Sequence, residues 1–279
     1  MKRVLDIKHF ENKNDNSIIG FDNQGGGGWE RWNRFITVNG TRIFEIGNIC
    51  GTCEIYFEKL KEINPKIDET EIAKKLNEGL NSIDDSTLQL IMQIMPKGSY
   101  SCALLQILPK DNSNNDYFSN EQRKTWGSEN FSGPKTDPKT NYFRGNDFGI
   151  KDKKLFIELF IPTQNSTIDE QRIQFYIDNI DKGENVTCLG LSVLDIKAPA
   201  MWEDSIEPEF ETHWCLSNYI IDGHHKIEAS KRTCKPITIL ALINKNESII
   251  EKGNQIDELL TKMKSQPITH DDDRITPSS

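Results

Sequence analysis

The stretch from Leu155 to Ile243 constrains the fold more than any other, because apolar runs and an amphipathic stripe alternate in it. The run "LFIELFIP" predicts a buried strand, and Gly183 marks the end of a helix-like stretch that follows. Thr167 and Glu170 have the spacing of a capping box, so a helix is expected over 168–182. Four apolar side chains share one face of this helix: Ile173, Tyr176, Ile177 and Ile180.

Three further apolar runs, "VTCLGLSVLDI", "WCLSNYII" and "PITILALI", predict strands, and a second helix is expected after Asp222-Gly223. The segment from Pro199 to His213 is acidic and is expected to be an irregular loop. The predicted order is strand, helix, strand, strand, helix, strand. This order predicts an α/β (α+β) fold built on a mixed sheet.

Residues 1–110 predict a separate N-terminal α+β module. A hairpin is expected at Asn39-Gly40, packing helices in "IDETEIAKKL" and "STLQLIMQIM", and a strand in "YSCALLQIL". A further helix, with Tyr56, Leu60 and Ile63 on one face, is expected after a Cys-x-x-Cys pair.

The Cys-x-x-Cys pair is Cys50 and Cys53. A thiol at a helix N-terminus has a lowered pKa, and the pair resembles the thioredoxin active site in its spacing. It is interpreted either as a redox pair or as two Zn²⁺ ligands, which would need distant partners such as Cys102 or His213.

The polarity of the remaining segments predicts the domain limits. Residues 111–149 are rich in Asn, Ser, Gly and Pro and predict a linker, and 150–264 form the predicted C-terminal domain. The last helix of that domain has an apolar stripe of Ile256, Leu259, Leu260 and Met263. Residues 265–279 have little apolar content and are predicted to be disordered.

Charge and cysteine content narrow the function classes. A net charge of -9 disfavours a nucleic-acid partner, because phosphate backbones attract basic proteins. Six scattered cysteines predict free thiols rather than a disulfide framework. No signal-peptide pattern or membrane-length apolar run is present, so we expect a cytoplasmic protein without membrane contact.

The turn "DGHHK", residues 222–226, predicts an anion site. Backbone N–H groups at a helix N-terminus attract anions, and Gly223 allows a phosphate to approach the backbone closely. His224 or His225 is expected to donate a hydrogen bond to a phosphate oxygen, and Lys226 to neutralise its charge. The alternative is structural, with Asp222 capping the helix, one histidine packed under the turn and a solvated lysine.

The element order and "YIIDGHHKIEASKRTCKPITILALI" resemble the ParB/sulfiredoxin superfamily over about 90 of 279 residues. The resemblance implies nucleotide binding at Gly223, His225 and Lys226, with ATP or another nucleotide and Mg²⁺ as cofactors. The Asp-Gly-His-His sequence of the turn is most similar to that of the free serine kinases. This similarity implies phosphoryl transfer to an acceptor that the sequence does not identify. Asp222 and His224 then belong to the catalytic residues, with Asp222 either as a Mg²⁺ ligand or as the residue that orients a histidine.

Glu158 is a lone carboxylate in an apolar strand, and burial of an unpaired charge is costly. The resemblance also implies a catalytic Glu on the first strand of the core, so Glu158 is predicted to be the general base. The alternative interpretation is a carboxylate on an edge strand that faces water.

Departures from the superfamily disfavour two of its activities, sulfinic acid repair and centromere-type DNA binding. The turn lacks the reactive cysteine of sulfiredoxin, and the 36 residues after Ile243 hold one amphipathic helix and a polar tail where a ParB protein has its helix-turn-helix. A nucleotide-gated regulatory protein without turnover and a ParB-like nuclease remain as alternatives to the kinase-like enzyme.

His213 and Cys215 are two residues apart and therefore point to the same face of a strand. They are interpreted as Zn²⁺ ligands, as redox residues, as part of a pocket floor, or as structural residues.

Overall fold

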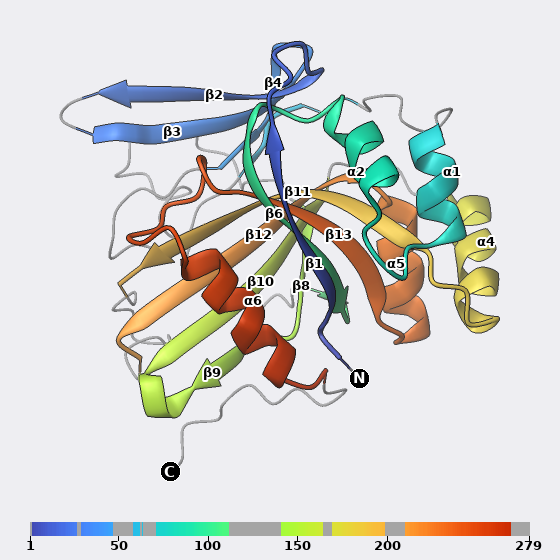
Figure 1. Cartoon of the computed structure of the whole chain (residues 1–279). Helices are drawn as coiled ribbons and strands as arrows, with labels where there is room; N and C mark the ends of the chain where they lie inside the picture. Colours follow the sequence, from blue (N-terminus) through green and yellow to red (C-terminus); the bar gives the residue numbers. More distant parts are fainter. Residues whose placement is uncertain are drawn as a thin grey trace, which may run out of the picture.

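The computed structural model describes residues 2–26, 29–46, 58–61, 63, 71–111, 141–163, 169–198 and 210–268. These residues form a mixed α/β fold with one large mixed sheet, one small antiparallel sheet and five α-helices (Figure 1). The mixed α/β class predicted from the sequence is confirmed.

The large sheet has nine strands, and eight of them follow one another across it. Their order is β1 (Val4–Asn12), β6 (Gly98–Ile107), β13 (Ile237–Asn244), β11 (Thr187–Lys197), β12 (Thr212–Asp222), β10 (Leu155–Thr163), β8 (Asn141–Arg144) and β7 (Lys110–Asp111). The ninth strand, β9 (Phe148–Ile150), also pairs with β10. β13 with β11 and β10 with β12 are parallel pairs, and the other pairs are antiparallel.

The small sheet consists of β2 (Ile19–Gly26), β3 (Trp29–Val38), β4 (Thr41–Glu45) and β5 (Glu58–Lys59). The predicted hairpin joins β3 and β4: Asn39 and Gly40 have φ angles of 48° and 73°, as a two-residue turn with left-handed residues requires.

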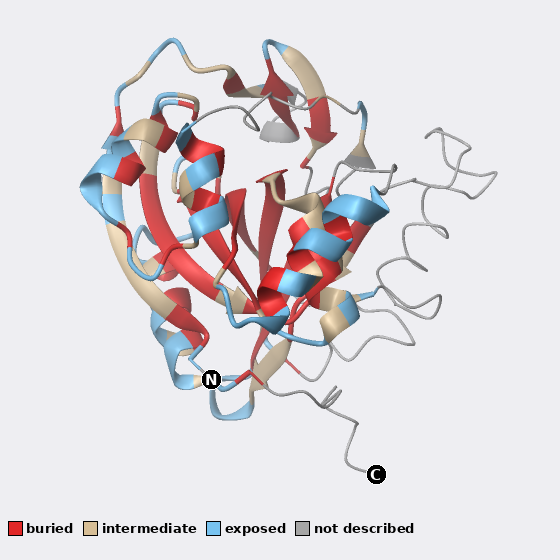
Figure 2. Ribbon diagram, turned by 90° about the vertical axis from the view of Figure 1, so that its right-hand side faces the viewer, coloured by how far each residue is buried: buried red, intermediate tan, exposed pale blue. Residues whose placement is uncertain are grey.

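Helices cover both faces of the large sheet. α1 (Glu71–Glu78), α2 (Asp85–Met92) and the small sheet contribute to one hydrophobic core, and α4 (Glu170–Asp181), α5 (His224–Thr233) and α6 (Gln255–Ser265) contribute to the other. The strands alternate between these cores: on β12, Cys215 and Tyr219 belong to the first and Trp214 and Leu216 to the second. Figure 2 shows helices that are buried toward the sheet and exposed on the other side.

The predicted order of elements over 155–243 is confirmed as β10, α4, β11, β12, α5 and β13. α4 ends as expected, because Gly183 has a φ of 83°. Its N-cap is Asp169, which accepts hydrogen bonds from the backbone of Gln171 and Arg172, and the predicted cap Thr167 lies outside the described residues. The apolar stripe predicted for the last helix is buried in α6.

Parts of four other predictions are wrong. The predicted linker 111–149 contains β8 and most of β9, and both strands pair with β10. A helix with Leu60 and Ile63 on one face is also wrong, because Glu58 and Lys59 pair with β4 and the described residues 60, 61 and 63 are not helical. Strand β12 already begins at Thr212, inside the predicted acidic loop, of which 199–209 lie outside the described residues.

Residues 265–268 are ordered, since Pro267 pairs with Lys2 and accepts a hydrogen bond from Arg3.

The large sheet crosses the predicted domain limits, because β6 from residues 1–110 pairs with β13 from residues 150–264. None of the described helices has the length and apolar character needed to cross a membrane.

Candidate metal centre

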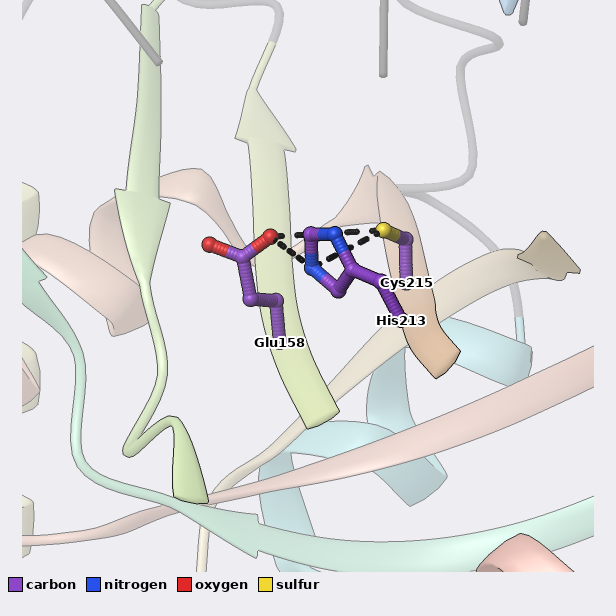
Figure 3. Close-up of side chains that lie close together, drawn as sticks. All are labelled: Glu158, His213 and Cys215. Carbon is purple, nitrogen blue, oxygen red and sulfur yellow. Dashed lines mark hydrogen bonds and ion pairs between the residues drawn. The ribbon is translucent and has the colours of Figure 1, made fainter. Parts of the chain in front are cut away.

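Two neighbouring parallel strands bring Glu158, His213 and Cys215 together (Figure 3). The register of β10 and β12 places Glu158 opposite Cys215. His213 is two residues earlier on β12 and therefore points to the same face. All three residues are buried, on the face of the large sheet that the small sheet covers.

The donor atoms of these residues converge within 4.8 Å of one another. Cys215 Sγ lies 3.4 Å from His213 Nε2 and 4.0 Å from Glu158 Oε2. His213 Nε2 and Glu158 Oε2 form a closer ion pair. Among the residues that the structure describes, this is the one group of three or more His, Cys, Asp or Glu side chains that meets so closely.

Burial and the neighbouring charges determine the protonation states of His213 and Cys215 when no metal ion is bound. Burial lowers the pKa of His213, but Cys215 and Glu158 raise it by more, so the net pKa lies well above the ordinary value. Burial raises the pKa of Cys215 to about 11, although His213 opposes this. At neutral pH, His213 is therefore an imidazolium paired with Glu158, and Cys215 is a thiol.

These residues are unsuited to nucleophilic catalysis by a thiolate. In a Cys-His-carboxylate triad the two ring nitrogens of His contact different partners. Here Nε2 contacts both Glu158 and Cys215. The raised pKa of Cys215 also disfavours the thiolate.

The same geometry suits a metal ion. Tetrahedral Zn²⁺, with bonds of about 2.0 Å to N or O and about 2.3 Å to S, separates its ligand atoms by about 3.3 to 3.6 Å. The Sγ–Nε2 separation of 3.4 Å is already in this range, and Sγ–Oε2 at 4.0 Å is slightly longer. An ion would replace the proton between Nε2 and Oε2 and move these two atoms apart.

The donor set indicates the class of metal. Thiolate, imidazole and carboxylate together suit Zn²⁺ and its neighbours, whereas Mg²⁺ prefers oxygen ligands alone. The predicted Mg²⁺ ligand Asp222 lies instead 3.2 Å from the ammonium of Lys226.

A second buried ion pair lies beside the centre. Asp195 on β11 is the register partner of Cys215 and binds Arg34 of β3 through both oxygens, at 3.1 and 2.5 Å. Arg34 also donates to the carbonyl of Glu247 at 2.6 Å. The small sheet is thereby attached to the large sheet next to the three candidate ligands.

The "DGHHK" turn has the predicted strand-turn-helix structure. β12 ends at Asp222, and α5 begins after Gly223, which has a φ of 111° and makes no side-chain cap. A Cβ at Gly223 would lie 2.6 Å from the sulfur of Cys188, so this position requires glycine. His225 Nε2 accepts a hydrogen bond from the backbone N–H of Asp169.

Lys226 differs from both interpretations made from the sequence. Its side chain is 1% exposed, so it is not a solvated helix residue. The ammonium donates to the carbonyl of Thr187 at 2.9 Å and to Asp222 at 3.2 Å. The ammonium of Lys226, which was predicted to neutralise a phosphate, is therefore bound by these two oxygens.

Glu158 and the turn lie far apart, which overturns their predicted combination in one active site. Glu158 aligns with Cys215, and Asp222 follows seven residues later on the same extended strand. At about 3.3 Å per residue, this separation is about 23 Å. The alternative of a water-facing edge carboxylate is also wrong, since Glu158 is fully buried on an internal strand.

Sequence reasoning missed Arg144, whose Nη1 lies 2.6 Å from Glu158 Oε1. The residue stands in "YFRGND", a polar segment that favoured a linker, and its one signal was the charge of Glu158 within an apolar run, which calls for a partner. Cys50 and Cys53 lie outside the described residues, so their assignment stays a prediction. The four described cysteines, at 102, 188, 215 and 234, are free thiols as expected.

Comparison of the chain with protein-family models, with curated proteins and with solved structures finds no match.

Proposed function

We propose that this chain is a metalloprotein in which Glu158, His213 and Cys215 bind a divalent transition-metal ion, with Zn²⁺ the best fit. The convergence of their three donor atoms within 4.8 Å carries this proposal. The buried charge partners of His213 raise its pKa, and groups perturbed in this way cluster at functional sites.

Among the residues that the structure describes, three supply ligand atoms, which is the number that catalytic zinc sites use, with a fourth tetrahedral position for water or substrate. An ion bound there supplies Lewis-acid chemistry. Glu158, His213 and Cys215 orient the ion, and binding displaces the protons from His213 and Cys215. The proposed reaction class is therefore metal-assisted hydrolysis.

Titration of the metal-free protein with Co²⁺ tests the binding, because a thiolate ligand gives Co²⁺ an intense charge-transfer absorption. We expect this band in the wild type and its loss in Cys215→Ser. Cys102→Ser is the matched control, since Cys102 is another buried free thiol and lies on β6. No band in the wild type, or an equal band in Cys215→Ser, would refute the proposal.

A nucleotide-binding phosphotransferase of the ParB/sulfiredoxin-like type is a second candidate. The supporting observation is that α5 starts at Gly223, which has no side chain to cap the first backbone N–H groups of the helix, and such groups attract anions. Glu158 is not part of this candidate, because it is too far from the turn.

Calorimetric titration with ATP, ADP, CTP and GTP in Mg²⁺ tests the second candidate. Binding that is lost in both Asp222→Ala and His224→Ala, but kept in Lys231→Ala, would support it; Lys231 is a partly buried lysine in the last turn of α5 and serves as the control. Product formation then separates an enzyme from a nucleotide-gated regulatory protein, and metal-dependent DNA degradation would indicate a nuclease. Absence of nucleotide binding eliminates the candidate.

A further inference from the structure

The segment 144–147 packs tightly onto β10 beside the proposed metal centre. The backbone N–H of Gly145 donates to the carbonyl of Leu159 at 2.8 Å, and the N–H of Leu159 donates to Asp147 Oδ1 at 2.9 Å. A Cβ at Gly145 would lie 2.7 Å from the Cβ of Leu159, so a larger residue would push the segment away. The chain is therefore shaped for close approach at this point.

This packing fixes the guanidinium of Arg144. Its Nη1 lies 3.1 Å from Asp147 Oδ2, and its central carbon lies 4.7 Å from the ring centroid of Phe160. Arg3, which is also buried, holds the same segment by donating to the carbonyl of Asn146 at 3.1 Å. The side chain of Arg144 is 8% exposed, so it cannot exchange this position for solvent without disrupting these contacts.

The fixed guanidinium gives the two oxygens of Glu158 different partners. Arg144 Nη1 lies 2.6 Å from Oε1, whereas Oε2 faces His213 and Cys215. A carboxylate whose second oxygen is bound by a guanidinium offers a metal ion one oxygen.

We propose that Arg144 is a positioning residue that holds Glu158 as a one-oxygen ligand and so makes the centre four-coordinate. The inference rests on the proposed metal function. It predicts a preference for Zn²⁺ and Co²⁺, which accept tetrahedral N, O and S ligands, over Mn²⁺, which favours oxygen-rich sites with more ligands.

The test compares the wild type with Arg144→Met and Arg144→Lys. In Arg144→Met both oxygens of Glu158 are available, so the ligand-field absorption of bound Co²⁺ weakens, as it does for five-coordinate Co²⁺. The Zn²⁺ affinity falls about 10- to 100-fold, the usual effect of removing such a partner, and the Zn²⁺:Mn²⁺ affinity ratio falls with it. Arg144→Lys, which keeps one charged donor, recovers most of both properties.

Arg42→Met is the matched control. Arg42 also pairs with a carboxylate, that of Asp22, and stacks on a ring, with its central carbon 3.9 Å from the centroid of Phe35, but it lies in the small sheet. An unchanged Co²⁺ spectrum and affinity ratio in folded Arg144→Met, or equal changes in Arg42→Met, would overturn the inference while leaving the metal site intact.

X-ray absorption of the Zn²⁺-loaded wild type provides a test that needs no variant. Four ligand atoms including one sulfur support the inference, and a fifth ligand from a two-oxygen carboxylate overturns it. If the wild type binds no metal, the proposed function itself fails, and this result is distinct from a change of coordination number.

Discussion

Glu158 illustrates at the residue scale how a buried carboxylate is tolerated. Its oxygens lie against Arg144 and His213, and an ion pair offsets desolvation when its geometry is good and its oxygens are satisfied. The sequence identified Glu158 as unusual because a charge interrupts an apolar run. It did not identify these partners, since they come from other strands.

Asp84 is a residue whose effect depends on pH. Its carboxylate accepts hydrogen bonds from Ser86 and Thr87 at the N-terminus of α2, and these bonds lower its pKa below the ordinary value. The stabilisation is therefore complete above the unfolded pKa of about 4 and is lost as the pH falls through the lower folded pKa. Asp84→Ala should lower the free energy of unfolding by about 1 kcal/mol at pH 7.

Urea unfolding at a series of pH values measures this effect. The difference between wild type and Asp84→Ala should shrink below a pH of about 4. Asp84→Asn, which keeps the cap without the charge, is the control and should retain its stability relative to Asp84→Ala as the pH falls. A wild-type advantage over Asp84→Ala that does not change with pH would contradict this explanation.

At the scale of elements, Lys226 attaches α5 to the sheet. It donates to the carbonyl of Thr187 in β11 and to Asp222 at the end of β12. Lys226→Met leaves both oxygens without this donor in a buried site, so the free energy of unfolding should fall by about 1 to 3 kcal/mol. Lys231→Met on the same helix, with a side chain 30% exposed, should change it by about 0.5 kcal/mol or less.

Thermal or urea unfolding of the two variants checks this prediction. If Lys226 instead contacts a nucleotide phosphate, Lys226→Met will weaken nucleotide binding and leave stability unchanged. That outcome would contradict a structural role for Lys226.

The elements over 155–243 were predictable because each has its own local pattern. β10 is a continuous apolar run, and α4 has an apolar stripe and Gly183 at its end. The shared face of His213 and Cys215 also follows from their spacing. Pairing was not predictable, because no local pattern states that Glu158 aligns with Cys215 or that β6 lies beside β13. Arg144 was missed because a polar segment containing a short strand resembles a loop.

At the scale of the whole molecule, Arg34 and Asp195 join the two sheets. Arg34 is fully buried, and the pair lies between β3 and β11. Arg34→Met leaves the buried carboxylate of Asp195 without its guanidinium, so the free energy of unfolding should fall by about 3 to 5 kcal/mol. The double variant Arg34→Met/Asp195→Leu should lose less free energy of unfolding than the two single variants lose together.

A double-mutant cycle measured by urea unfolding checks the coupling. Strictly additive effects would show that the two sheets do not depend on this pair. Arg42→Met again serves as a control, because its ion pair with Asp22 lies within the small sheet and is partly exposed.

The most direct test of the account is the Zn²⁺ content of the protein after equilibrium dialysis. We expect one tightly bound ion per chain in the wild type and loss of that ion in His213→Gln. Cys50→Ser/Cys53→Ser is the comparison that separates this centre from the other predicted zinc ligands, and it should keep the ion. Equal Zn²⁺ in the wild type and His213→Gln, or none in either, would contradict a metal centre at Glu158, His213 and Cys215.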